Sequence, residues 1–472
     1  MAFTSPQADL LPRHPVIIGD SRLEKGSGLV MPHVYPGTGQ VTREIAMANA
    51  DDVDRAVAAA RAAFPAWRAM PGDKRRNLFF KLAEIFEARS AEFAPSLISE
   101  NGSVAMIAPY MGYDAAQKFR YFGGWCDKIH GRTIPMWGAP AHDYVSYEPY
   151  GVVGVIVPWN GPLFAATMVI APALAAGNCI VLKSPDFAPY SAMKLVEIML
   201  EAGFPAGVVN LVTGAADVGE AMVAHPGIDK IEFIGSGATA KKVLANAAQS
   251  LKPVGLELGG KSALIVRADA NLQEAAMSAL GGFTVHCGQG CALTTRHLVH
   301  NSVRPQFVEM LKGMMAHIKI GNPVDPKVSY GPLIREVARQ RTERYVQIAQ
   351  DEGATLIAGG KRPEGFDKGF FFEPTLFDNV RNDSRLAQEE VFGPIGAVIG
   401  FNDDEEAIAL ANASDFGLSG AICSADAGKA FEMALRIRTG GVSINGGGGT
   451  MLSDAPFGGI KRSGYGREYG ED

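Results

Sequence analysis

The 472-residue chain has few cysteines, and they form an odd-numbered set. Five cysteines spread over this length exclude a disulfide-stabilised scaffold and favour a reducing compartment with free thiols. The N-terminus, residues 1–20, lacks an apolar core behind a basic start, so it does not have the pattern of a secretory signal. We therefore expect a cytoplasmic protein.

Long apolar runs and an excess of positive charge are also missing. The most apolar stretch, residues 165–182, is interrupted by Pro172 and Gly177 and predicts a buried helix and strand, not a membrane span. Lys and Arg number 44 against 50 Asp and Glu, a net charge of -6 without long runs of one sign. This balance predicts no binding of nucleic acid or of an anionic membrane, and it favours small-molecule chemistry.

The remaining composition is that of a globular protein of about three domains at roughly 150 residues each. The spacing of apolar residues predicts amphipathic helices over 51–70 and 74–100. Short extended pieces between residues 129 and 150 predict a β-hairpin. Beyond Tyr150, apolar strands alternate with helices, which predicts an α/β fold with parallel sheets. These strands are expected at residues 152–157, 179–183, 208–212, 230–234 and 263–266.

Two short motifs carry groups suited to nucleophilic chemistry. Cys291 follows Gly288-Gln289-Gly290, whose small residues would let a substrate approach the sulfur; a buried cysteine acting as a small apolar residue is the alternative. Glu257 precedes Leu258-Gly259-Gly260-Lys261 at a strand end, where it could act as a general base or form a surface pair with Lys261.

Three further motifs lie where strands end. Asn160 could donate to an oxyanion or cap a helix. Gly235 and Ser236 join a strand to a helix N-terminus that could bind phosphate, or they form an unliganded tight turn. Lys183 and Asp186 could bind the hydroxyl groups of a ribose or form a surface ion pair.

Taken together and in order, these motifs resemble the NAD(P)-dependent aldehyde dehydrogenase superfamily, in its non-acylating type. The resemblance extends from about Phe64 to the C-terminus. It rests on Pro158-Trp159-Asn160, Phe233-Ile234-Gly235-Ser236, Glu257-Leu258-Gly259-Gly260-Lys261, Gly288-Gln289-Gly290-Cys291, Glu390-Val391-Phe392-Gly393-Pro394 and Pro456-Phe457-Gly458-Gly459.

The resemblance implies roles in catalysis for four residues. Cys291 would add to the aldehyde, and Asn160 with the Cys291 backbone N–H would stabilise the oxyanion. Glu257 would activate the water that hydrolyses the thioester, and Glu468 would assist proton transfer. No metal is implied.

The resemblance also implies residues that bind the cofactor. They are Ile156, Trp159, Lys183, Asp186, Gly214, Gly235, Ser236, Glu390 and Phe392. Where the family usually has Lys-Pro-x-Glu, this chain has Lys183-Ser184-Pro185-Asp186. The carboxylate of Asp186 would still repel a 2'-phosphate, so we expect NAD over NADP.

The expected substrate is a medium to large apolar aldehyde, aromatic or branched. Small or unusual residues stand where family members often have bulkier ones, and the glycine-rich loop after Asn445 should lie at the mouth of a wide tunnel. The residues expected to line the substrate pocket are Gly161, Leu163, Met168, Val285, Gly290 and Phe457.

The same resemblance divides the chain into a Rossmann-type cofactor domain, an α/β catalytic domain and a small β oligomerisation arm. Residues 1–126 and 150–256 would form the first, residues 257–445 the second, and residues 127–149 with 446–472 the arm and C-terminal segment. We expect a homodimer or homotetramer. The alternatives are a CoA-acylating semialdehyde dehydrogenase, which usually lacks the base at Glu257, a catalytically silent scaffold, and a cysteine-dependent hydrolase.

Overall fold

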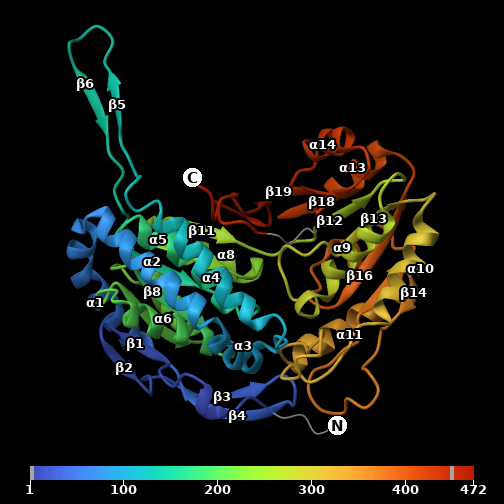
Figure 1. Cartoon of the computed structure of the whole chain (residues 1–472), viewed down its shortest axis with the longest axis horizontal. Helices are drawn as coiled ribbons and strands as arrows, with labels where there is room; N and C mark the ends of the chain where they lie inside the picture. The colour runs from blue at the N-terminus through green and yellow to red at the C-terminus, as the bar shows by residue number, and fades with distance from the viewer. Residues whose placement is uncertain (1–4, 447–450, 472) are drawn as a thin grey trace.

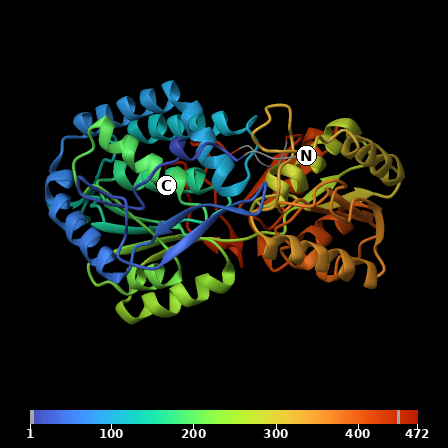
Figure 2. The same ribbon diagram turned by 90° about the horizontal axis from the view of Figure 1, so that it is seen from below.

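Two β-sheets organise the chain into two α/β lobes that lie side by side (Figures 1 and 2). The computed structural model describes residues 5–446 and 451–471. Residues 447–450, in the glycine-rich loop expected at the tunnel mouth, therefore lie outside the described residues. The fold class predicted from the sequence, α/β with parallel sheets, is confirmed.

The first sheet has a parallel centre with antiparallel edges. Its strands β9, β8, β7, β10 and β11 run parallel, and β1, β2 and β21 complete the edges antiparallel. In sheet order the strands are β2 (Ser21–Leu23), β1 (Val16–Ile18), β9 (Val209–Gly214), β8 (Cys179–Pro185), β7 (Val152–Ile156), β10 (Lys230–Ile234), β11 (Val254–Glu257) and β21 (Gly464–Tyr465). Because helices cover both faces, every residue of β7, β8 and β9 is buried.

The second sheet is parallel except at β14. In sheet order its strands are β14 (Thr355–Ala358), β15 (Thr375–Asp378), β16 (Ile395–Phe401), β13 (Arg296–His300), β12 (Ala263–Val266), β18 (Ser419–Cys423) and β19 (Gly441–Ile444). The carboxyl ends of parallel strands share one edge of each sheet, which is where ligands bind in open α/β folds.

Helices surround both sheets. Those of the first lobe are α1 (Ala50–Ala69), α2 (Gly72–Ala88), α3 (Ala94–Asn101), α4 (Ala108–Gly123), α5 (Pro162–Ala175), α6 (Tyr190–Ala202), α7 (Ala216–Ala224) and α8 (Gly237–Ala247). Those of the second are α9 (Leu272–Thr284), α10 (Arg304–Met315), α11 (Glu336–Asp351), α12 (Arg385–Gln388), α13 (Asp404–Asn412) and α14 (Ala427–Ala434). Short 3-10 turns occupy Ala8–Leu10, Ser90–Phe93, Ala248–Ser250 and Val285–Gly288.

Three two-stranded pairs lie outside these sheets: β3 (Val30–Tyr35) with β4 (Gln40–Ala46), β5 (Arg132–Pro135) with β6 (His142–Val145), and β17 (Phe416–Gly417) with β20 (Ile460–Lys461). The β5–β6 hairpin projects away from the first lobe (Figure 1). It lies inside the predicted hairpin region.

The helix predicted over 74–100 is not continuous. The structure ends α2 at Ala88, inserts the 3-10 turn Ser90–Phe93 and starts α3 at Ala94, with Pro95 in its first turn. Proline is tolerated at that position because its missing N–H would have no partner inside the helix. The predicted helix over 51–70 matches α1, whose N-terminus is closed by a reciprocal capping box between Asn49 and Asp52.

Candidate active site

A cavity of about 200 Å³ opens between the two lobes. It is formed by the segment between β7 and α5, the ends of β10 and β11, the loop that carries Cys291, helix α11, the segment at Glu390 and the C-terminal segment. Its lining consists of Pro158, Trp159, Asn160, Gly161, Phe164, Ala165, Met168, Ile234, Gly235, Ser236, Glu257, Leu258, Gly259, Cys291, Arg341, Glu390, Phe392, Met451 and Phe457.

The loop that presents Cys291 has an unusual backbone. His286 and Cys287 have φ of 48° and 55°, and Gly288 follows with φ of 69°. A side chain at position 288 would place its Cβ 2.2 Å from the Gly393 carbonyl oxygen. The loop therefore packs directly on the segment that follows Glu390, and only glycine fits at 288.

Gln289 holds this loop in place. Its Oε1 accepts a hydrogen bond from the Ile334 N–H at 3.0 Å, and its Nε2 donates to the His286 carbonyl at 3.0 Å. The Gln289 carbonyl in turn accepts from Asn160 Nδ2 at 3.0 Å. These bonds connect the Cys291 loop of the second lobe to the Asn160 amide of the first.

Asn160 does not cap helix α5, because the cap position belongs to Gly161. The backbone carbonyl of Asn160 accepts a hydrogen bond from Asn101 Nδ2 at 3.1 Å, and Asn101 is itself buried. The capping alternative is thus not what fixes Asn160. Its side-chain amide keeps one N–H that can donate into the cavity.

Glu257 and Cys291 form a buried acid and thiol pair. Burial raises the pKa of Glu257 to about 8, a hydrogen bond from the Cys291 thiol lowers it, and the charge of Glu390 raises it. Burial, followed by the charges of Glu257 and Glu390, raises the pKa of Cys291 well above its ordinary value. The thiol therefore holds its proton at neutral pH and must lose it before the sulfur can attack, and the carboxylate form of Glu257 is an adjacent proton acceptor.

Glu390 is fixed by the glycines that follow Glu257. Its Oε1 accepts from the Gly260 N–H at 3.0 Å, and a Cβ at Gly259 would lie 2.2 Å from its Oε2. Burial raises the pKa of Glu390. The two glycines of the Glu257–Lys261 motif are thus needed for close packing between the lobes.

Seven of the nine residues that the resemblance assigns to the cofactor lie at the carboxyl ends of strands of the first sheet, and the other two, Glu390 and Phe392, precede β16 of the second sheet. Lys183 is buried, and burial lowers its pKa to about 8, against the charges of Asp186 and Asp217. A Cβ at Gly219 of α7 would lie 3.9 Å from the Lys183 side chain and 4.0 Å from Ile156, so these three residues border one groove. No ion pair joins Lys183 to Asp186 among the described residues.

Gly214 and Ser236 stand at two other strand-to-helix connections of the first lobe. Gly214 is the last residue of β9 and is buried. Ser236 is the N-cap of the 11-residue helix α8, and its Oγ accepts from the Thr239 N–H at 3.3 Å. The exposed N-terminus of α8 leaves backbone N–H groups that suit a phosphate.

Aromatic rings border the cavity beside Glu390. The rings of Trp159 and Phe392 meet edge to face, with centroids 5.4 Å apart. Arg341 of α11 donates from Nη2 to the Phe392 carbonyl at 3.3 Å, and its buried Nε has no partner among the described residues. A cationic group with an unused donor facing this cavity fits an anionic or hydroxyl-rich ligand such as a dinucleotide, and the sequence had not indicated Arg341.

Three of the six residues expected in the substrate pocket do not line the cavity. Leu163 is fully buried in the core of the first lobe. Val285 is 49% exposed at the end of α9. A Cβ at Gly290 would meet Leu293 at 2.9 Å. Gly161, Met168 and Phe457 do line the cavity, together with Phe164, Ala165 and Met451, which the sequence had not indicated.

Glu468 lies next to the cavity and is not part of its lining. Its backbone exchanges two hydrogen bonds of 2.7 Å with Phe457. Burial and the charge of Glu232 raise the pKa of Glu468 well above its usual value, Lys230 opposes this shift, and the Glu257 charge adds to it. Glu468 is therefore close enough to Glu257 to sense its charge.

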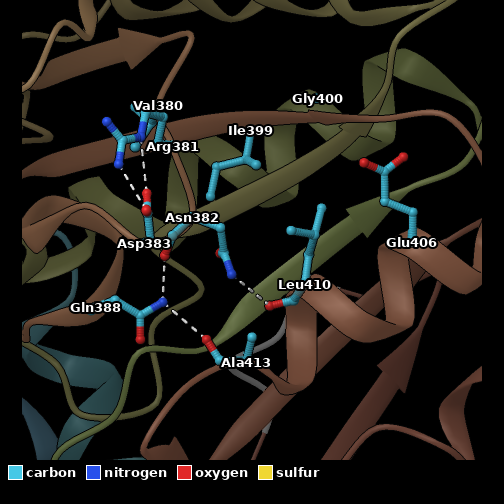
Figure 3. A pocket seen from close by; sticks show the side chains of 10 residues that line it. All are labelled: Val380, Arg381, Asn382, Asp383, Gln388, Ile399, Gly400, Glu406, Leu410 and Ala413. Carbon is cyan, nitrogen blue, oxygen red and sulfur yellow. Dashed lines mark hydrogen bonds and ion pairs between the residues drawn. The ribbon is translucent and has the colours of Figure 1, made fainter.

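A second hollow, of about 630 Å³, lies in the second lobe away from these residues (Figure 3). Its polar side chains bond to one another or to nearby carbonyls. Gln388 donates to the Asn382 and Ala413 carbonyls, Asn382 donates to Leu410, and Arg381 pairs with Asp383. The hollow thus leaves little unused hydrogen-bonding capacity for a ligand.

Two kinds of feature are absent from the described residues. Within residues 5–446 and 451–471, no helix is long and apolar enough to cross a membrane. The same residues contain no cluster of three or more His, Cys, Asp or Glu side chains that could hold a metal ion.

The sequence matches the model of the aldehyde dehydrogenase family over residues 24–472. The chain belongs to the aldehyde dehydrogenase family. It is accordingly an oxidoreductase that acts on aldehydes. Among its relatives are betaine aldehyde dehydrogenase of Bacillus subtilis (strain 168), 40% identical over 89% of this chain and 87% of the relative, and human retinal dehydrogenase 2, 40% identical over 97% and 88%.

Solved structures of the same family share the fold. Betaine aldehyde dehydrogenase from Staphylococcus aureus, in complex with NAD+, is 36% identical and superposes with a TM-score of 0.94 over 98% of this chain and 93% of that one. PnpE from Pseudomonas sp. WBC-3 is 39% identical, with a TM-score of 0.94 over 97% and 94%. The complex of PnpE with nicotinamide adenine dinucleotide superposes with a TM-score of 0.95, over 97% of this chain and 94% of that one.

Proposed function

We propose that this family member oxidises a medium to large apolar aldehyde, aromatic or branched, to the carboxylic acid, with NAD+ as oxidant. The observation that carries the proposal is that Cys291, Glu257 and Asn160 line one cavity. Nucleophile, base and oxyanion donor come from three separate segments and meet in one place.

The first half of the reaction follows from these groups. Glu257 accepts the thiol proton, and Sγ of Cys291 forms a bond to the carbonyl carbon of the aldehyde. The resulting oxyanion accepts hydrogen bonds from Asn160 Nδ2 and the Cys291 N–H. The hydride of this carbon would leave to NAD+, which would supply the oxidising power when it is held by the cofactor residues named below. The thioester then remains on Cys291.

The second half uses Glu257 again as a base. Glu257 takes a proton from water, the water oxygen bonds to the thioester carbon, and the bond to Sγ breaks to release the acid. Glu468, whose proton affinity responds to Glu257, relays protons from this base. The presence of Glu257 beside Cys291 favours water over CoA as the acceptor.

For the cofactor, Lys183 and Asp186 would bind the adenine ribose, with Ile156 along the groove. Gly214, Gly235 and Ser236 would approach the pyrophosphate, and Glu390, Phe392 and Trp159 would hold the nicotinamide side. The two relatives solved with this dinucleotide support the assignment to NAD. The carboxylate of Asp186 favours NAD over NADP, so the KM for NAD+ should be the lower one.

The apolar side of the cavity supports the proposed substrate class. Phe164, Met168, Met451 and Phe457 line the same cavity as Gly161, which has no side chain to fill the space. The test is absorbance of NADH with a panel of aliphatic, aromatic and terpenoid aldehydes, with and without CoA. Turnover without CoA and a higher kcat/KM for benzaldehyde than for acetaldehyde are expected. A need for CoA, or preference for acetaldehyde, would contradict the proposal.

We also propose that the protein self-associates, as a homodimer or homotetramer, through the β5–β6 hairpin. Ile134, Met136, Trp137 and Tyr144 are exposed there, Trp137 completely. Light scattering coupled to gel filtration should give at least twice the chain mass. The five cysteines are all free thiols, which is consistent with a reducing compartment such as the cytoplasm.

A further inference from the structure

A buried lysine on helix α4 lies directly behind the apolar wall of the cavity. Lys118 has a side chain only 1% exposed, and its ammonium group is 2.5 Å from Asp114 Oδ2 on the same helix. Nζ also donates to the Phe164 carbonyl at 3.3 Å and to Thr167 Oγ1 at 3.3 Å. Neither member of this ion pair belongs to a motif that the sequence indicated.

Lys118 is attached to the wall through the ring of Phe164 as well. Its Nζ lies 3.5 Å from the centroid of that ring, close enough for a strong cation–π contact at a buried position. Phe164 itself lines the cavity. The ring therefore cannot swing away from the cavity without leaving the ammonium group, and it presents a fixed apolar surface to the aldehyde.

The same contacts hold the first turns of helix α5. Thr167 Oγ1 donates to the Leu163 and Phe164 carbonyls at 3.0 and 3.1 Å while it accepts from Lys118. Lys118 thus uses all three ammonium hydrogens on acceptors, two of them on α5.

The C-terminal segment meets the same lysine. The ring of Tyr469, the residue after Glu468, has its centroid 5.7 Å from Lys118 Nζ. Tyr469 has φ of 64° and is buried in the core of the first lobe. One buried charge therefore contacts helix α4, helix α5 and the segment that carries Glu468.

We propose that the buried Asp114–Lys118 pair is a positioning device that fixes Phe164 and so sets the preference of the enzyme for aromatic or branched aldehydes over small ones. The inference deepens the proposed function and rests on it for the identity of the substrate. Asp114 keeps the ammonium group charged in an apolar setting, and the ammonium group keeps the ring in place. A small aldehyde does not reach this wall, so its oxidation does not depend on the pair.

The test compares Lys118→Met with the double variant Asp114→Leu, Lys118→Met. Removing the lysine alone leaves a carboxylate without its partner and lowers the Tm, whereas removing both charges restores much of it. Both variants lose the contact with Phe164. The ratio of kcat/KM for benzaldehyde to that for acetaldehyde should fall about tenfold in both, through a higher KM for benzaldehyde.

The matched control is Lys252→Met. Lys252 also donates to buried carbonyls, those of Val223 and His225, and lies outside the cavity lining. Its substitution should lower the Tm and leave the aldehyde ratio unchanged. An unchanged ratio in both Lys118 variants, or an equal fall in Lys252→Met, would overturn the proposal. If Lys118→Met does not fold, the aldehyde ratio of the double variant alone tests the proposal.

A second readout does not depend on dehydrogenase activity. Alkylation of Cys291 by iodoacetamide and by benzyl bromide, followed by peptide mass mapping, compares access of a small and an aromatic reagent to the same sulfur. The benzyl to acetamide rate ratio should also fall in both Lys118 variants. If the wild-type protein oxidises no aldehyde, the proposed function fails, while this ratio still tests the role of the pair.

Discussion

The first lobe meets the cavity with the ends of regular elements, whereas the second lobe meets it with irregular loops and with Arg341 of helix α11. β7, β10 and β11 end beside the cavity, and α8 begins there with Ser236 as its cap. On the other side, His286, Cys287 and Phe392 all have positive φ without being glycine. The first lobe thus lines the cavity with ordinary strand-to-helix turns and carries Glu257 at the end of β11, whereas the nucleophile Cys291 follows backbone that only tertiary contacts can hold.

The contrast between the two lobes is tested most directly by removing the proposed nucleophile. Cys291→Ala should lower aldehyde turnover by about 10⁴-fold or more, because no other described group in the cavity can form the thioester. Cys287→Ala is the matched control. That thiol is buried and donates to the Gly331 carbonyl, so its loss should affect the Tm more than the rate. Steady turnover by Cys291→Ala would remove the residue from the mechanism.

The next largest effect is expected at the base. Glu257→Gln should still form the thioester, with solvent water taking the thiol proton in place of the carboxylate. It should hydrolyse the thioester about 10²- to 10⁴-fold more slowly, since an amide cannot accept the proton from the attacking water. Rapid mixing with NAD+ and aldehyde should then show one burst of NADH per active site, followed by a slow steady rate. A full steady rate would mean that water is activated elsewhere.

The pH dependence tests the same group in the native protein. Burial raises the pKa of Glu257 to about 8, so less of the carboxylate form is present at lower pH. The hydrolysis rate should rise about tenfold per pH unit from about pH 6, and level off above pH 8. A single-turnover profile of the Glu257→Gln variant should lose this rise. A profile already flat at about pH 6 would contradict the raised pKa.

A smaller effect is expected from removing the hydrogen bonds that hold the Cys291 loop. Gln289→Ala removes the bonds to Ile334 and His286 and should lower kcat about tenfold, because a loosened loop presents Cys291 less accurately. Gln388→Ala is the control, since Gln388 also donates to two carbonyls but lies in the distant hollow of Figure 3. Equal loss of kcat in both variants would indicate general destabilisation.

The smallest effect is expected from a substitution in the first lobe, at the N-cap of helix α8. Ser236→Ala removes the cap of α8 and costs about 1 kcal/mol of helix stability. The KM for NAD+ should rise about fivefold, with kcat unchanged, because the α8 N-terminus is less well ordered for a phosphate. A larger effect on kcat than on KM would show that the two sides of the cavity do not work separately.

The same contrast explains what the sequence could predict. The strands at 152–157, 179–183, 208–212 and 230–234 were predicted because buried parallel strands are continuous apolar runs between turn residues. The positive φ values at His286 and Cys287 leave no such pattern, since values of this sign are uncommon for any residue except glycine. The next residue, Gly288, packs against Gly393, which is more than a hundred positions away in the sequence.

The sequence also could not predict which side chains of α5 point toward the cavity. This helix is apolar on almost every side, so its sequence does not show which face turns toward the cavity. Leu163 was expected there, and Phe164 takes the place. Asn101 and Arg341 were missed for another reason: each acts through a contact to a distant backbone carbonyl, which single-sequence patterns do not reveal.

Gly161 offers a route for redesigning the enzyme. Its φ of -153° suits any amino acid, and a Cβ built there meets only Phe164 Cβ, at 3.6 Å. By contrast, a Cβ at Gly288 or at Gly260 would lie only 2.2 or 2.6 Å from a backbone carbonyl oxygen. Position 161 can therefore be varied to reshape the space for the aldehyde, while the glycines that join the lobes must be inherited unchanged by any engineered descendant.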